Sequence, residues 1–285
     1  ALSTSNTAVL DMFVYSLPWA AGDRILTTQS EYGANYVAYL HIAARTGAVV
    51  EVVPNNEAGE LDVDALERMI DDRVKLISVN HVPTNGGLVN PAAAIGKVAN
   101  AHGIPYLLDA CQSAGQIPLD VEAIGCDALT ATGRKFVRGP RGTAFLWVRQ
   151  SLLETIDPIT IDHDAATWTS PTTYELKPDA SRFEVWEKGW AGLLGLGAAI
   201  DYALDWGLDN IQDRIVEVAE SLRTRLTDEV PDAEVRDLGT NRCGIVTFSL
   251  GDRDLPTLKT ELQQQGINVS IVPPASALLD TMARD

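Results

Sequence analysis

Short apolar runs alternate with helix-like stretches through the first half of the chain, and this alternation restricts the fold more than any other feature. Buried strands are expected at residues 24–28, 49–53, 74–79, 105–109, 127–130 and 143–148. Helical patterns lie between the earlier strands, at residues 35–45, 62–70 and 91–101. Strands that alternate with helices predict an α/β fold with a mostly parallel sheet sandwiched by helices.

The pattern changes in the second half. Residues 151–181 are polar and contain scattered prolines, which predicts loops over a cleft. Helical patterns resume at 190–206 and 208–226, and a strand, a helix and a strand are then expected at 244–250, 255–265 and 267–272. We therefore predict a large domain at residues 1–205 and a partial small α+β C-terminal domain at residues 206–285. The chain begins without methionine and ends just after the last expected strand, so we expect truncation at both ends.

The composition is that of a globular protein with an acidic surface. Apolar residues make up 46% of the 285 residues, which is enough to bury a large core. Acidic side chains outnumber basic ones by 39 to 22, and the formal charge of -17 repels nucleic acid and anionic lipid. We therefore expect no nucleic-acid partner and no membrane partner.

The cysteines and the lack of a targeting pattern bear on location and on metal binding. Cys111, Cys126 and Cys243 are too few and too scattered for a disulfide framework or a metal cluster, so no metal site is predicted. No apolar run is long enough to cross a bilayer, and the first residues do not resemble a signal segment. These features favour a reducing compartment and a cytoplasmic location.

Two charged side chains that follow expected strands suggest a cofactor. Asp109 ends an apolar run, and ligands of parallel sheets bind beyond the carboxyl ends of the strands. A protonated pyridine nitrogen would satisfy such a buried carboxylate, and the Lys135 amine, in a turn after the next strand, can form a Schiff base. Alone, an aspartate usually caps a turn and a lysine is usually a surface charge. Together they predict pyridoxal 5'-phosphate (PLP).

Neighbouring polar side chains can complete such a site. Thr132 and Arg134 flank the lysine and can offer a hydroxyl and a guanidinium to a phosphate. Asn6 and Thr7 precede a helix-like segment whose positive end can face the same phosphate, although an ordinary helix cap explains them equally well. Tyr32 follows a polar run and can stack on a ring, or lie exposed in a loop.

Several segments resemble the class V aminotransferase family of fold type I PLP enzymes. The resemblance is strongest to the branch that contains cysteine desulfurases, selenocysteine lyases and isopenicillin N epimerase-like proteins. The segments are AGDRI at 21–25, EYGAN at 31–35, HVPTNGG at 81–87, DACQS at 109–113, ATGRK at 131–135 and RFE at 182–184. An aspartate and a glutamine in the pattern D-x-x-Q, followed by a lysine after the next strand, are highly specific to this family.

The resemblance implies a role for each candidate residue. Lys135 is the Schiff-base lysine and the catalytic acid and base, Asp109 is the partner of the pyridine nitrogen, and Tyr32 replaces the histidine that stacks on the ring. The remaining cofactor contacts are Gln112 and Thr84 near the phenolic oxygen, Thr132 and Arg134 on the phosphate, and Thr7 with Asn6 completing the phosphate cup. The family's homodimers place their sites at the interface, where residues 187–190 would reach the partner's phosphate.

Departures from the desulfurase pattern affect the expected reaction. Arg134 stands where desulfurases have a histidine, and Ala275 stands where those that align have a persulfide-forming cysteine. Cys111 is expected to be apolar packing under the cofactor strand, as are Cys126 and Cys243. Without a thiolate in the substrate loop, no persulfide relay is expected. The family's arginine for the substrate carboxylate is expected after Asp285.

The favoured function is therefore that of a PLP-dependent enzyme that forms an external aldimine with an amino-acid substrate and removes its alpha proton. A desulfurase-like carbon–sulfur or carbon–selenium lyase without a persulfide cysteine is the first choice. An aminotransferase or an amino-acid epimerase is the alternative. A nucleotide-binding oxidoreductase is disfavoured because no G-x-G-x-x-G turn follows a strand. A cofactor-free binding protein on a relic fold is the remaining hypothesis from another class.

Overall fold

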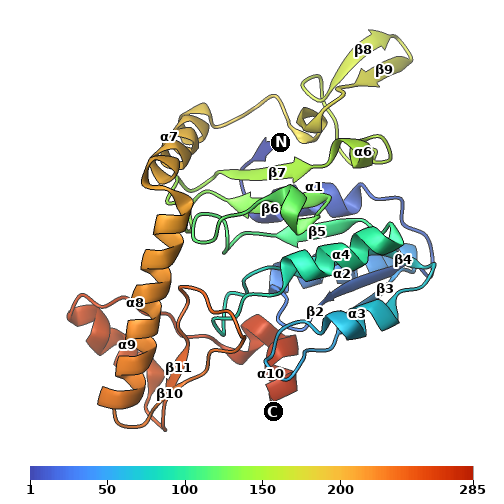
Figure 1. Cartoon of the computed structure of the whole chain (residues 1–285). Helices are drawn as coiled ribbons and strands as arrows, with labels where there is room; N and C mark the ends of the chain where they lie inside the picture. Colours follow the sequence, from blue (N-terminus) through green and yellow to red (C-terminus); the bar gives the residue numbers. More distant parts are fainter. Residues whose placement is uncertain (285) are drawn as a thin grey trace.

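A computed structural model describes residues 1–284 and contains a seven-stranded sheet with helices on both faces (Figure 1). The strands are Leu2–Ser3 (β1), Arg24–Thr28 (β2), Val49–Val53 (β3), Val74–Asn80 (β4), Tyr106–Asp109 (β5), Ala128–Thr132 (β6) and Ala144–Val148 (β7). Their order is β1-β7-β6-β5-β4-β2-β3. Strands β2 to β6 run parallel, whereas β7 and β1 are antiparallel to their neighbours. The predicted mostly parallel sheet is confirmed.

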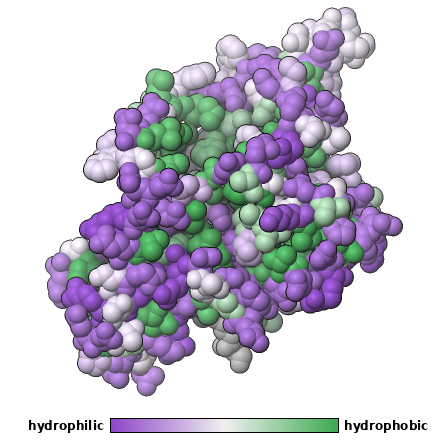
Figure 2. All heavy atoms as spheres, viewed as in Figure 1, coloured by the Kyte–Doolittle hydropathy of each residue, from purple (hydrophilic) through white to green (hydrophobic). Residues whose placement is uncertain are grey.

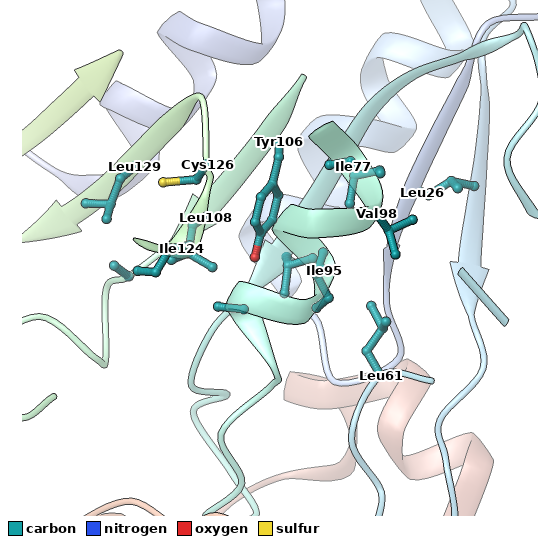
Figure 3. Close-up of a cluster of buried hydrophobic side chains, with 14 of the residues drawn as sticks. Leu26, Leu61, Ile77, Ile95, Val98, Tyr106, Leu108, Ile124, Cys126 and Leu129 are labelled. Carbon is teal, nitrogen blue, oxygen red and sulfur yellow. The ribbon is translucent and has the colours of Figure 1, made fainter. Parts of the chain in front are cut away.

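Helices cover this sheet because alternate strand residues point to opposite faces. The first-half helices are Asn6–Tyr15 (α1), Gly33–Thr46 (α2), Val63–Met69 (α3), Ala92–His102 (α4), Val121–Ile124 (α5) and Gln150–Leu153 (α6). Leu107 of β5 packs in one apolar cluster with Phe13 of α1 and Tyr39 of α2. Its neighbours Tyr106 and Leu108 belong to the other cluster, with Ile95 and Val98 of α4 (Figure 3). Burial on both faces explains why these strands read as continuous apolar runs.

The second half contains more regular structure than the sequence predicts. Its elements are Ala166–Ser170 (β8), Thr173–Leu176 (β9), Ala180–Phe183 (η1), Trp190–Trp206 (α7), Leu208–Glu229 (α8), Ala233–Val235 (β10), Phe248–Leu250 (β11), Leu255–Gln264 (α9), Pro274–Ala277 (η2) and Leu278–Arg284 (α10). Residues 151–181, predicted as loops, include the β8–β9 hairpin, which projects from the body in Figure 1. The exposed aromatic pair of Trp168 and Tyr174 lies across this hairpin.

One predicted strand is wrong. Residues 267–272 alternate apolar and polar residues, yet they are irregular in the structure. Strand β11 pairs with β10, so within residues 1–284 this segment lacks the ladder that a strand requires. The division of the chain at residue 205 remains a prediction. Among the described helices, none is long and apolar enough to cross a membrane.

Candidate active site

The carboxyl ends of the parallel strands meet at one edge of the sheet, and the candidate site lies at this edge. Asp109 ends β5, where it pairs with Asn80 of β4 and with Thr130 of β6. Tyr32 follows β2 and Lys135 follows β6. The fold therefore brings a carboxylate, an aromatic ring and an amine from distant segments to the edge where open parallel sheets bind ligands.

Asp109 is buried and accepts three hydrogen bonds from amide groups. Its Oδ1 accepts from Asn6 Nδ2 at 3.2 Å and from the Cys111 backbone N–H at 2.8 Å, and its Oδ2 accepts from Asn35 Nδ2 at 2.7 Å. Burial raises the pKa of Asp109, while these hydrogen bonds and the charge of Lys135 oppose the rise. Within the described chain Asp109 forms no ion pair. A cation bound beside it would therefore stabilise its ionised form.

Lys135 faces an aromatic ring and a thiol. Its Nζ lies 5.9 Å from the centroid of the Tyr32 ring, and its charge acts to lower the pKa of the Cys111 thiol. Burial raises the pKa of the Cys111 thiol to about 11, so this group is protonated at neutral pH. Cys111 is half-buried, so it is less completely packed than a core residue. Cys126 does belong to the core.

The loop that carries Lys135 is fixed by its backbone. Gly133 N–H donates to the Thr143 carbonyl at 2.9 Å, and Arg138 N–H donates to the Lys135 carbonyl at 2.9 Å. A Cβ at Gly133 would lie 2.3 Å from Thr143 Oγ1 and 2.8 Å from Leu196 Cδ1, so a larger residue would force these side chains to shift. The amine of Lys135 is therefore presented from a loop of defined shape rather than from a mobile one.

The predicted phosphate-binding residues lie on two neighbouring segments. Arg134 is exposed, and in residues 1–284 it forms no ion pair with a carboxylate. Thr132 is buried, and its hydroxyl donates to the Thr143 carbonyl at 3.0 Å. Thr7 is exposed in the first turn of α1, where the amide groups of a helix have no partner within the helix. A free guanidinium and a helix N-terminus form a reasonable anion site.

Asn6 makes a contact that the resemblance does not suggest. Its amide is buried and directed at Asp109, not outward from the helix end. Ser5 caps α1 instead, since its Oγ accepts from the Ala8 N–H at 3.1 Å. The predicted contact of Asn6 with a phosphate stays a prediction, and the structure adds a contact with the carboxylate.

Gln112 and Thr84 come together on another side of the site. Gln112 Nε2 donates to Thr84 Oγ1 at 3.4 Å. The backbone of Gln112 is fixed as well, because its main-chain carbonyl accepts a hydrogen bond from Gln116 Nε2 at 2.5 Å. The two side chains can present an amide and a hydroxyl to the same oxygen atom of a ligand.

The residues at this edge fit PLP. Asp109 offers a buried carboxylate to a pyridinium nitrogen, Tyr32 offers an accessible ring, Lys135 an amine and Arg134 a cation for the phosphate. Polar side-chain atoms near the same strand ends lack a hydrogen-bond partner within the described chain: Asn6 Oδ1, Thr28 Oγ1, Ser30 Oγ and His81 Nδ1. Buried polar groups are rarely left unpaired, so this edge is suited to a polar ligand.

Two residues at the site escaped prediction. Asn35 donates both amide protons to carboxylates, one to Asp109 and one to Glu31 Oε1 at 3.0 Å. Glu31 is buried as well, and it also accepts from Thr27 Oγ1 at 2.6 Å and from the Tyr32 N–H at 2.8 Å. Both residues lie in the EYGAN segment at 31–35, which carries part of the family resemblance, but that segment alone does not show that they contact Asp109.

The chain matches a family model and several curated proteins of similar sequence. The family model described as aminotransferase class V matches residues 3–274. A probable cysteine desulfurase from Synechocystis sp. is 32% identical over 283 residues, which cover 92% of this chain and 64% of that protein. The chain thus spans less than two thirds of this curated relative.

Solved structures with the same fold extend the comparison. The apo structure of a cysteine desulfurase from Thermococcus onnurineus NA1 has a TM-score of 0.88 and 25% identity, and the match covers 100% of this chain and 71% of that one. The cystine C-S lyase C-DES, bound to its product cysteine persulfide, has a TM-score of 0.86 and 25% identity over 95% of this chain and 74% of its own. A mutant of C-DES, 24% identical, carries glycine covalently linked to its PLP cofactor.

Proposed function

The chain belongs to the aminotransferase class V family, and from that premise we propose that it is a PLP-dependent enzyme that acts on an amino acid. One observation carries the proposal. Asp109 is a buried carboxylate at the ligand-binding edge of the sheet, with amide donors and no ion-pair partner in residues 1–284. A pyridinium nitrogen supplies the missing positive charge.

The residues around the site have separate tasks in this proposal. Asp109 keeps the ring nitrogen protonated, and Tyr32 stacks on the ring. Arg134, Thr132 and Thr7 bind the phosphate, while Gln112 and Thr84 bind the phenolic oxygen. The loop geometry around Gly133 orients the amine that holds the cofactor.

When bound, PLP supplies an electron sink that makes the alpha hydrogen of an attached amino acid acidic. Lys135 Nζ removes that proton and can return it. Tyr32 lies beside the amine, with its ring centroid 5.9 Å from Lys135 Nζ. The Cys111 thiol is also close to Lys135, but its raised pKa keeps it from acting as a competing thiolate nucleophile at neutral pH.

The reaction that we propose is cleavage of a carbon–sulfur or carbon–selenium bond in the substrate. Relatives named cysteine desulfurase and cystine C-S lyase support this choice. Position 275 lies in η2 and is exposed. Because the residue there is alanine, it offers no thiol to take up the sulfur. We therefore expect release of the sulfur product rather than an enzyme persulfide at that position. Transamination and epimerisation start with the same proton removal and are the alternatives.

A homodimer is part of the proposal. Helix α7 and the residues before it expose large apolar side chains, including Trp186 (62%), Trp190 (63%) and Leu194 (74%). Figure 2 shows hydrophobic surface gathered in the area where α7 lies in Figure 1. Exposed apolar patches of this kind support association. Light scattering of the wild type and of a Trp190→Glu, Leu194→Glu variant tests the dimer, because the double substitution should give monomers.

We also propose a cytoplasmic location. Cys111, Cys126 and Cys243 are free thiols, and thiols remain reduced in the cytosol. Fractionation of cells that produce the full-length protein, compared with a cytosolic marker, tests this assignment.

Spectroscopy and product analysis test the enzymatic proposal. The wild type should acquire a visible absorption band when PLP is added, and Lys135→Ala should not acquire the lysine-linked band. Lys97→Ala, which removes an exposed lysine of α4, is the matched control and should behave like the wild type. A wild type that stays colourless with added PLP contradicts the proposal.

The reaction is then identified from the products with cysteine, cystine and selenocysteine. Pyruvate formation indicates a lyase, a keto acid with retained sulfur indicates an aminotransferase, and inversion at the alpha carbon indicates an epimerase. Pyruvate formed at equal rates by wild type and Lys135→Ala would contradict the role of Lys135.

A further inference from the structure

A buried chain of three polar side chains runs from the interior of the protein to the carboxylate at the site. Asn35 Nδ2 bridges Glu31 Oε1 at 3.0 Å and Asp109 Oδ2 at 2.7 Å. All three residues are at most 5% exposed. Because both amide protons of Asn35 are used by carboxylates, its orientation is determined, and each carboxylate influences the other through it.

Glu31 has no obvious structural reason to be a carboxylate. It accepts hydrogen bonds from Thr27 Oγ1, the Tyr32 N–H and Asn35, all of them neutral donors. In the part of the chain that the structure describes, it forms no ion pair. A glutamine would fill the same volume and could keep these contacts, with its oxygen accepting from Tyr32 and Asn35 and its amide facing Thr27. The difference between the two side chains is that glutamine cannot carry the negative charge.

We propose that Glu31 is a positioning residue that regulates cofactor binding through Asn35 and Asp109. This inference rests on the proposed PLP-dependent function. When Glu31 is ionised, its charge adds to that of Asp109 and draws a pyridinium nitrogen more strongly into the site. When Glu31 is protonated, the site holds a single negative charge and binds the cofactor less tightly. Glu31 also fixes the backbone of Tyr32, the ring that lies beside Lys135.

The groups around Glu31 place this change near neutral pH. Burial raises the pKa of Glu31 to about 7, hydrogen bonds from Thr27, Tyr32 and Asn35 oppose the rise, and the charge of Asp109 adds to it. Tyr39 of α2 feels the charge of Glu31, Lys135 acts on Asp109 from the other side, and Asp280 of α10 lines a small cavity with Glu31. Tyr39 stays neutral because its own pKa is raised well above the usual value.

The experiment compares PLP affinity of wild type, Glu31→Gln and Glu57→Gln at pH about 6 and about 8, on either side of the expected titration. Glu57 is an exposed glutamate outside the Glu31–Asn35–Asp109 chain, so its variant has the same change in charge without altering that chain. At the higher pH, Glu31→Gln should bind PLP about tenfold more weakly than wild type. At the lower pH, the two should agree within about twofold, since Glu31 is then neutral in both. Glu57→Gln should match wild type at both.

A second variant keeps the test valid if Glu31→Gln folds poorly. Thr27→Val retains Glu31 but removes one of its donors, so the pH at which binding strengthens should rise. Equal weakening of Glu31→Gln at both pH values would show a merely structural role, and unchanged affinity at both would show no role; either result overturns the inference. A wild type that binds no PLP at either pH refutes the proposed function itself, and the inference with it.

Discussion

Asn35 Nδ2 donates a hydrogen bond of 2.7 Å to Asp109 Oδ2, and this contact joins the start of α2 to the end of β5. The carboxylate cannot rotate without breaking it, since the Cys111 N–H and Asn6 hold the other oxygen. The direction in which Asp109 faces a ligand is therefore fixed by a residue that does not itself need to touch that ligand.

Asn35→Ala should weaken PLP binding about tenfold, because it removes a donor from a buried carboxylate. Equilibrium titration of the visible band measures the effect. Asn100→Ala is the matched control, since Asn100 Nδ2 donates to the Gly125 carbonyl at 3.2 Å, away from the site. Equal affinity in the two variants would contradict the positioning role of Asn35.

Glu31→Gln should stabilise the cofactor-free chain at alkaline pH and leave it unchanged at acid pH. The pKa of Glu31 is raised from 4.5 to about 7, so the folded chain holds this proton more tightly than the unfolded chain. Between these values the unfolded state loses its proton first, and stability falls as pH rises. Above the folded pKa the loss reaches about 3 kcal/mol, which glutamine does not incur.

Urea unfolding at pH about 4 and about 8 measures this difference in the free energy of unfolding. Glu57→Gln serves again as the control and should follow the wild type throughout. A wild type whose stability relative to Glu31→Gln does not change with pH would show that Glu31 keeps an ordinary pKa.

The central sheet could be predicted from short apolar runs, and β2 and β3 were located to the residue, although only β2 is buried along its whole length. The β8–β9 hairpin could not, because Trp168 and Tyr174 face solvent and leave no burial pattern. Residues 267–272 failed for the opposite reason: their apolar and polar residues alternate as in a strand, but no partner strand lies beside them in the described chain. The site was predicted at the ends of β5 and β6 from the expected sheet topology together with the chemistry of Asp109 and Lys135.

The hydrogen bonds inside the site could not be predicted from the sequence. Asn6 and Asp109 are separated by 103 residues, and nothing in their local patterns indicates that the amide faces the carboxylate. Glu31 and Asn35 are close in sequence, at the start of α2, but nothing in that segment indicates that a third residue, from β5, completes the chain. Such contacts depend on how the elements pack, which local periodicity does not encode.

Gly133→Ala should destabilise the protein by about 1–3 kcal/mol and displace the loop that carries Lys135. The new methyl group would lie 2.3 Å from Thr143 Oγ1, within a loop closed by backbone hydrogen bonds. Urea unfolding and the PLP absorption band measure both effects. Gly197→Ala in α7 meets no heavy atom within 4 Å and should stabilise by about 0.5–1 kcal/mol. Similar behaviour of the two variants would mean that the Lys135 loop adapts freely.

Arg223→Met should cost about 3–5 kcal/mol of stability, because it leaves a buried charge unpaired. Arg223 of α8 donates to Asp237 Oδ2 at 2.7 Å and to the carbonyls of Cys243 and Ile245 at 2.8 Å. The side chains of Arg223 and Asp237 are 4% and 0% exposed, so water cannot replace the lost partner. This contact therefore ties α8 to the segment around β10 and β11.

Arg225→Met is the matched control on the same helix, since Arg225 pairs with Glu229 on the solvent-screened surface and its loss should change stability little. Adding Asp237→Asn to Arg223→Met should restore part of the loss, because the asparagine can still accept from the Thr247 N–H that donates to Asp237 at 2.7 Å. Denaturant unfolding of the wild type, the two single variants and the double variant separates the loss of the ion pair from the cost of leaving Asp237 unpaired. If Arg223→Met and Arg225→Met lose equal stability, the buried pair does not hold α8 in place, and the packing of α8 must be explained by its apolar contacts alone.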